Sequence, residues 1–156
     1  VDRAFRSLDK IKPHVTVWWE KGAQPAQLMT DREVDMTYAY SGRIANIIKD
    51  GVPAAISFNG GSVNIEWLVI TKGTTKVKEA MQFIAFCAQP KPQAEFNAAM
   101  QYGPINSKAF DFIDPEVARN LPTAPQYIDH VWIPNAEWWA DKDEEINERW
   151  NAWVLE

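Results

Sequence analysis

Cysteine and histidine are scarce in this chain of 156 residues, which holds one cysteine and two histidines. With Cys87 alone, no disulfide can form within the chain. Neither His14 nor His130 has metal ligands at the usual spacing, so we predict no metal site and no cofactor. Nucleophile and phosphate-binding motifs such as G-x-S-x-G, the P-loop and G-x-G-x-x-G are missing too. These absences favour a protein that is not an enzyme.

Long apolar runs and an excess of positive charge are also missing. No run of about 18 apolar residues exists, so we predict no membrane-spanning helix. The chain has 16 basic and 21 acidic residues, a net charge of −5, and no block of Lys and Arg. Nucleic-acid binding needs such a block to neutralise phosphates, so we predict no nucleic-acid partner.

Tryptophan is the residue present in excess. The chain has 8 Trp, where ordinary usage gives about two. Such rings fill a core or line a site that grips something flat, sugar-like or cationic. Adjacent residues of a strand face opposite sides, so at most one of Trp18 and Trp19 is expected in the core and the other is a candidate for a cleft. Core positions are predicted for Trp67, Trp150 and Trp153.

Strand and helix patterns alternate in the first half of the chain, and helices dominate the second half. This order predicts an α/β fold with much wrapping helix and loop. Ser41 is predicted to cap a helix. The predicted strands span 15–19, 35–40, 54–58 and 62–71, and the predicted helices span 2–10, 25–30, 42–49, 75–88, 91–100 and 145–154.

Polar side chains at the ends of predicted strands are the candidates for binding, because ligands of α/β sheets lie outside the carboxyl ends of strands. The small Ser41-Gly42 pair opens a helix, and a helix N-terminus attracts anions. Arg43 follows and can hold a carboxylate with two hydrogen bonds, or be a solvated helix residue. Asn64 and Glu66 share one face of an apolar strand. A half-buried Glu66 needs a cation, from the protein or from a ligand ammonium.

Five segments in order resemble bacterial extracellular solute-binding proteins of ABC transporters, particularly the spermidine/putrescine-binding type. Each segment alone is a weak signal, but the order and spacing match across essentially the whole chain. The segments are residues 18–43 (WWEKGAQPAQLMTDREVDMTYAYSGR), 60–70 (GGSVNIEWLVI), 78–86 (KEAMQFIAF), 102–106 (YGPIN) and 136–141 (AEWWAD).

The resemblance implies the C-terminal half of a two-lobe periplasmic-binding-protein fold of type II, an α/β fold that traps its ligand between the lobes. Residues 1–61 would then form the end of the second lobe, which is incomplete. Residues 62–156 would supply a hinge strand and the C-terminal part of the first lobe, also incomplete. The exposed edges of such a half imply a partner, either the missing N-terminal half or a second copy of the chain.

The resemblance also implies binding residues. The family's aromatic before the Ser-Gly turn falls on Tyr40, and its hinge-strand carboxylate, which grips a ligand ammonium, falls on Glu66. The tyrosine before Gly-Pro falls on Tyr102. A ligand-facing residue near the C-terminus falls on Trp139. Because Trp18 and Trp19 face opposite sides of the predicted strand, Trp19 is a further candidate for the cleft.

Two departures from the family pattern bear on the ligand. Asn64 stands where polyamine binders have Trp, and Arg43 lies close to the expected site. Because Arg43 repels a polycation and attracts a carboxylate, we expect a small amine or amino acid-like zwitterion. Glu66 would hold its ammonium and Arg43 its carboxylate. The resemblance further implies a periplasmic location and a permease partner in the inner membrane, although no signal peptide is recognisable in this sequence.

Two other interpretations of the sequence differ in class. A Trp-rich cleft could belong to a carbohydrate-active enzyme or carbohydrate-binding module, with carboxylates from Glu20, Glu66 and Glu137. No local spacing places two of these to flank one bond. A pure interaction domain would show neither turnover nor ligand binding.

Overall fold

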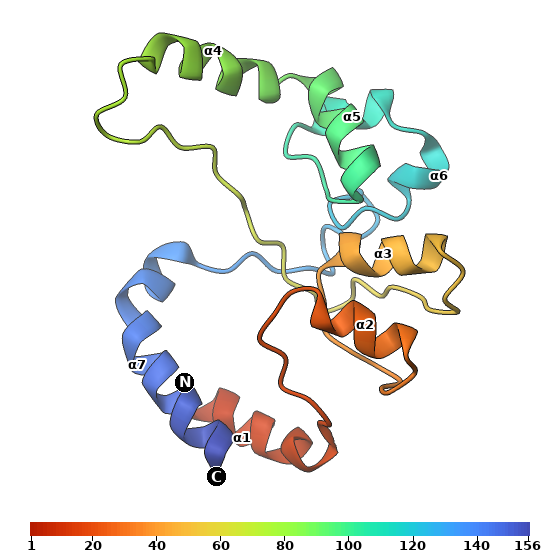
Figure 1. Ribbon diagram of the computed structural model, residues 1–156, viewed down its shortest axis with the longest axis vertical. Coiled ribbons are helices and arrows are strands. Elements are labelled where there is room, and N and C mark those ends of the chain that lie inside the picture. Colours follow the sequence, from red (N-terminus) through yellow and green to blue (C-terminus); the bar gives the residue numbers. More distant parts are fainter.

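The computed structural model describes residues 1–156 and is a set of helices joined by long irregular segments (Figure 1). Helices α1 and α7 lie side by side at one end, α2 and α3 lie near the middle, and α4 to α6 lie at the other end. The elements are α1 (Asp2–Ile11), η1 (Lys12–His14), α2 (Gln24–Thr30), α3 (Ser41–Lys49), α4 (Val77–Cys87), α5 (Pro90–Met100), η2 (Ser107–Phe112), α6 (Pro115–Ala118) and α7 (Ala136–Leu155). No helix has both the length and the apolar character to cross a bilayer.

The four strand predictions are wrong for this structure, because segments 15–19, 35–40, 54–58 and 62–71 form no ladder. One isolated parallel bridge joins Ser62 to Trp132. The residue types in these segments favour extended backbone, but a strand also needs a neighbour to accept its hydrogen bonds. Residues 64–69 are exposed, and the segment crosses open space towards α4 without a neighbour (Figure 1).

The helix predictions are confirmed, with corrections at the ends. Pro25 lies in the first turn of α2, where its missing N–H costs nothing. Helix α7 begins well before the predicted residue 145, because the Asn135 side chain accepts from the Trp138 amide and caps it. The predicted Ser41 cap is wrong: Tyr40 is the cap residue of α3, and the Ser41 hydroxyl donates to the Gln101 carbonyl at 3.4 Å.

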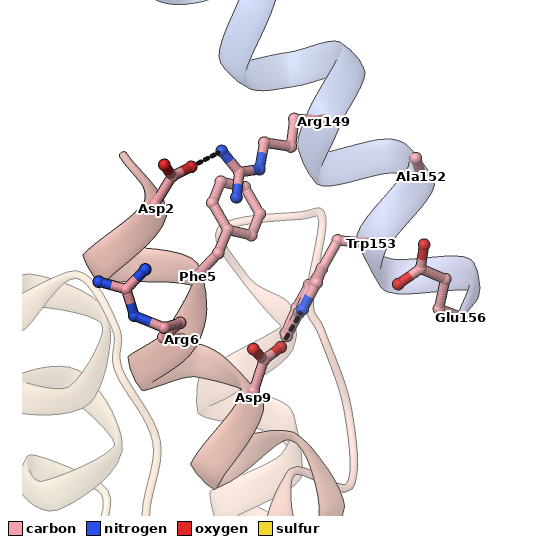
Figure 2. A pocket seen from close by; sticks show the side chains of 8 residues that line it. All are labelled: Asp2, Phe5, Arg6, Asp9, Arg149, Ala152, Trp153 and Glu156. Carbon is pink, nitrogen blue, oxygen red and sulfur yellow. Dashed lines mark hydrogen bonds and ion pairs between the residues drawn. The ribbon is translucent and has the colours of Figure 1, made fainter.

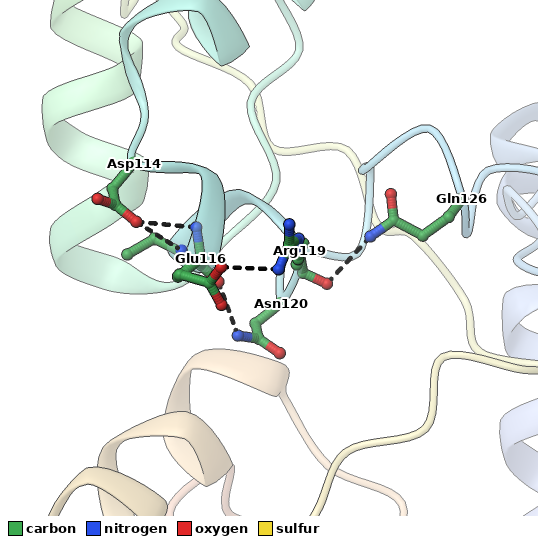
Figure 3. Close-up of polar contacts among 6 residues, drawn as sticks. Asp114, Glu116, Arg119, Asn120 and Gln126 are labelled. Atoms are coloured by element: carbon green, nitrogen blue, oxygen red, sulfur yellow. Dashed lines mark hydrogen bonds and ion pairs between the residues drawn. The ribbon is translucent and has the colours of Figure 1, made fainter.

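The short helix α6 is held by polar contacts around its ends (Figure 3). The Asp114 carboxylate accepts from the Glu116 amide at 2.8 Å and so caps the helix. Glu116 pairs with Arg119 at 2.7 Å, and the Asn120 side chain donates to the Glu116 carbonyl at 2.9 Å. These local bonds order a segment in which the sequence predicts short helices at most.

Little of the chain is buried: 14 of 156 residues. One core cluster joins α5, η2 and α6, and it comprises Ala94, Ala109, Ile113 and Leu121. Helix α4 buries no residue, although its apolar spacing predicts a core face. Trp67, predicted to be core, is 76% exposed. Both predictions fail for the same reason, since the packing in this chain buries neither the apolar face of α4 nor residues 64–69.

A cluster of aromatic rings joins α1 to α7 and encloses Trp153, which is 7% exposed. Trp153 meets Phe5 at 6.0 Å and Trp18 at 5.3 Å between ring centroids, both edge to face. Trp150 lies 5.2 Å from Trp18. The predicted core positions of Trp150 and Trp153 are therefore confirmed by this packing, in which Trp153 is buried and Trp150 is half-buried. The Lys12 ammonium lies 4.3 Å above the Trp153 ring and donates to the Trp153 carbonyl.

Polar bonds surround this cluster and line a groove of about 410 Å³ between the two helices (Figure 2). The Trp153 indole donates to Asp9 at 2.7 Å, and Arg149 pairs with Asp2 at 2.6 Å. Arg149 also lies 4.2 Å over the Phe5 ring. The hydrogen bond from Arg149, together with its charge, holds the pKa of Asp2 below its usual value.

Trp153→Ala tests whether the aromatic cluster holds α1 against α7. Removal of a buried tryptophan costs about 3–5 kcal/mol of unfolding free energy. Trp67→Ala is the matched control: because Trp67 is exposed, its loss should change stability by about 0.5 kcal/mol or less. Urea denaturation followed by circular dichroism measures both. Equal losses in the two variants would contradict the assignment.

Asp2→Asn tests the ion pair with Arg149. Because folding lowers the pKa of Asp2, the stabilisation is present above the pKa of the unfolded carboxyl and is lost as the pH falls through the folded pKa. We expect the variant to be slightly less stable at neutral pH and equal to the parent protein in acid. Urea titrations at a series of pH values measure the difference. A difference in unfolding free energy between the variant and the parent protein that persists in acid would show that the ion pair does not cause it.

Candidate functional site

Two of the predicted site residues, Trp19 and Tyr40, meet at the N-terminus of α3. Their ring centroids are 6.1 Å apart at 61°. Tyr40 has extended backbone at the start of the helix, and the residue is 47% exposed. The Trp19 indole donates to the Tyr38 carbonyl at 2.9 Å, which fixes the ring. Gly22 lies against Tyr40, since a Cβ there would come within 3.0 Å of the ring.

A third predicted residue, Tyr102, approaches the same helix end from α5. Gly42, in the first turn of α3, is buried. A Cβ on Gly42 would overlap the Met100 carbonyl oxygen and lie 3.0 Å from the Tyr102 ring. Gln101 ends α5 in the left-handed conformation (φ 58°), which turns the chain so that Tyr102 faces α3. The absence of a side chain at Gly42 therefore lets α5 and Tyr102 come close.

Adjacent Trp18 and Trp19 take opposite sides, as their spacing predicts. Trp18 packs against Trp150 and Trp153, whereas Trp19 lies against Tyr40. Trp19, Tyr40 and Tyr102, the candidate aromatics around the start of α3, thus come from three separated stretches of sequence.

Arg43 gives this aromatic group a positive neighbour. It lies in the first turn of α3, is exposed, and takes part in none of the three ion pairs of the structure. No side chain caps this helix, whose first-turn amides carry the positive end of the helix dipole. The helix end and Arg43 together favour a carboxylate, while the rings beside them offer faces that attract an ammonium.

The other predicted residues are not brought to this group. Asn64 and Glu66 lie in the exposed stretch 64–69, and Glu66 forms no ion pair, so its predicted half-burial is not found. Trp139 lies near the start of α7, 38% exposed, with its ring 5.3 Å from that of Trp138. Of the seven predicted residues, Trp19 and Tyr40 thus contact each other at the start of α3, Arg43 lies in the first turn of that helix, and Tyr102 lies against Gly42 in the same turn.

Sequence reasoning missed Tyr38 and Gly22 as parts of this site. Tyr38 stands two residues before Tyr40, and that spacing in an extended segment was the only signal available. The importance of Gly22 depends on the path of the chain, which brings it under the Tyr40 ring. No three side chains of the metal-ligating types come together as a metal site anywhere in the structure.

Comparison with known proteins gives a consistent result. The model of the bacterial extracellular solute-binding protein family matches residues 1–125. The gamma-aminobutyric acid-binding protein of Pseudomonas aeruginosa is 40% identical over 154 residues, which are 99% of this chain and 44% of that protein.

Solved structures agree. An ABC transporter substrate-binding protein from Bradyrhizobium japonicum superposes with a TM-score of 0.87 at 37% identity, over 98% of this chain and 48% of that one. The binding protein AgtB of Agrobacterium tumefaciens, solved with agropinic acid, superposes with a TM-score of 0.78 at 31% identity. The match covers 99% of this chain and 49% of AgtB. The expected fold class, part of a two-lobe binding-protein fold, is confirmed.

This chain spans about half the length of the relatives that it matches. Those relatives are binding proteins. With the family match across most of the chain and 40% identity to a curated member, the chain belongs to the bacterial extracellular solute-binding protein family.

Proposed function

We propose that this chain forms part of the substrate-binding component of an ABC importer, and that its ligand is a small zwitterion of the 4-aminobutyrate type. The observation that carries the proposal is the position of three aromatic residues around the start of α3: Trp19 contacts Tyr40, and Tyr102 lies against Gly42. Arg43, which takes part in none of the three ion pairs, lies in the same first turn. A ligand with one carboxylate and one ammonium matches the two kinds of group at this point.

The carboxylate is assigned to Arg43 and the first-turn amides of α3, where hydrogen bonds between charged groups are strongest. The ammonium is assigned to the aromatic faces, each of which adds about 0.5–2 kcal/mol of attraction. Glu66 completes the ammonium site in this proposal when segment 62–71 lies beside α3. In the present structure residues 64–69 of that segment, Glu66 among them, are exposed.

A zwitterion is favoured over spermidine or putrescine for two reasons. Arg43 lies in the first turn of α3, three residues after Tyr40, and would repel a polycation bound there. The Pseudomonas relative, at 40% identity, is named for gamma-aminobutyric acid. The binding role of the relatives also favours ligand capture over the carbohydrate-active enzyme that the tryptophan content suggested.

The domain assignment extends the proposal. We assign residues 1–61 to the second lobe and residues 62–156 to a hinge strand and the C-terminal part of the first lobe, so that the chain corresponds to the C-terminal half of its relatives. The exposed segment 62–71 and the uncovered helix α4 support this assignment. Segment 62–71 has the composition of a strand within a parallel sheet, and α4 has that of a helix packed on the face of such a sheet. In this assignment the protein works in the periplasm and hands its ligand to a membrane permease.

Arg43→Gln tests the carboxylate contact by titration calorimetry with 4-aminobutyrate. Loss of a charge-assisted hydrogen bond costs about 1.5–3 kcal/mol, so we expect the affinity to fall about 10- to 100-fold. Arg3→Gln, an exposed arginine on α1, is the matched control and should bind as the parent protein does. Spermidine and agropinic acid are titrated beside it. Tight spermidine binding with no response to 4-aminobutyrate would overturn the proposal.

Gly42→Ala tests the packing that brings Tyr102 to α3. The added Cβ collides with the Met100 carbonyl and crowds the Tyr102 ring, an overpacking that costs about 1–3 kcal/mol of stability. We expect a lower melting temperature and weaker 4-aminobutyrate binding. Asn46→Ala, on the exposed side of the same helix, should leave both unchanged. Unaltered melting and binding in Gly42→Ala would show that the close approach is not needed.

A further inference from the structure

Tyr38 makes hydrogen bonds at both of its ends to residues far away in the sequence. Its backbone carbonyl accepts from the Trp19 indole at 2.9 Å. Its phenol oxygen lies 2.5 Å from the Ser62 hydroxyl and accepts from the Ser62 amide at 3.2 Å. The side chain is 61% exposed, so apolar burial does not explain where the ring lies.

Ser62 is itself the point where two distant stretches of chain meet. It forms the parallel bridge with Trp132, the one β-type contact of the structure. The Val63 amide donates to the Trp132 carbonyl at 2.9 Å, and the Trp132 amide donates to the Gly61 carbonyl at 3.0 Å. These bonds join residues 61–63 to the stretch that leads into α7. We call this group of bonds the Ser62 junction.

A chain of hydrogen bonds therefore runs from the binding-site aromatics to the Ser62 junction. Trp19 lies against Tyr40 at the site and is bonded to Tyr38, and Tyr38 is bonded to Ser62. Trp19 has no other side-chain hydrogen bond in the structure. Its indole orientation thus depends on where the Tyr38 backbone lies, and the Tyr38 phenol fixes that backbone to the junction.

We propose that Tyr38 is a positioning residue, which holds the Trp19 ring of the ligand site in place through its hydroxyl contact with Ser62. Ligand affinity then depends on two hydroxyl groups that do not touch the ligand. The part of this proposal that concerns affinity rests on the proposed function. The structural part, the dependence of Trp19 on Ser62, does not.

The structural part is tested without ligand by NMR of the Trp19 indole N–H, assigned by its loss in Trp19→Phe. We expect Ser62→Ala and Tyr38→Phe each to shift this resonance and to speed its exchange with solvent several-fold. Ser62→Thr keeps the hydroxyl and should restore the parent signal. Ser57→Ala, a nearby exposed serine, is the control. If the Trp19 indole resonance keeps its position and its exchange rate in Ser62→Ala, and this variant has the circular dichroism of the parent protein, the proposal is overturned.

The affinity part is tested by calorimetry with 4-aminobutyrate. One hydrogen bond contributes about 1 kcal/mol net, so each single variant should bind about fivefold more weakly. The double variant should be no weaker than either single, because both remove the same contact. Tyr127→Phe is the control for loss of a phenol oxygen elsewhere.

The outcomes separate the two proposals. If the parent protein does not bind 4-aminobutyrate but the indole still responds to Ser62→Ala, the ligand assignment is wrong and the positioning contact stands. If the parent binds and the indole responds, yet the affinity of Tyr38→Phe is unchanged, Tyr38 does not position the site. Additive losses in the double variant would show that the two hydroxyls act separately.

Discussion

Every extended segment of this chain needs a second strand to accept its backbone hydrogen bonds, and the structure offers one at a single point, between Ser62 and Trp132. This constraint explains the open arrangement of Figure 1. Helices satisfy their own backbone groups and form where their sequences favour them, whereas the β-prone segments form no ladder and residues 64–69 are exposed to water. The relatives are about twice as long, which leaves ample sequence in the family for the strands that segment 62–71 lacks.

Secondary structure was predictable where its cause is local. The proline in the first turn of α2 and the spacing of apolar residues in α4 indicate those helices whatever surrounds them. The strands were not predictable as paired structure, because pairing depends on a neighbour that a local pattern does not reveal. The exposure of Trp67 follows from the same cause: its alternation indicates a buried strand face, but nothing in this chain covers that face.

The candidate site likewise contains residues that a local sequence pattern indicates and contacts that no local pattern indicates. Tyr40 and Arg43 could be found because a strand-like segment running into a helix is a recognisable pattern, and Tyr102 because it matches a family motif. The contacts that organise the site could not. Gly22 under the Tyr40 ring and Ser62 against the Tyr38 phenol join residues whose separation carries no periodic signal. Only the three-dimensional path of the chain brings them together.

The contact between α1 and α7 has a consequence for how the chain reaches this structure. Asp9 and Trp153, which share a hydrogen bond, are separated by 144 positions, so their meeting closes a loop that contains nearly the whole chain. Closing so long a loop is entropically costly and slow compared with forming a helix. The group formed by α5, η2 and α6 is built from neighbours in sequence, and it can assemble at once. We therefore expect folding to finish, rather than begin, with the docking of the two end helices.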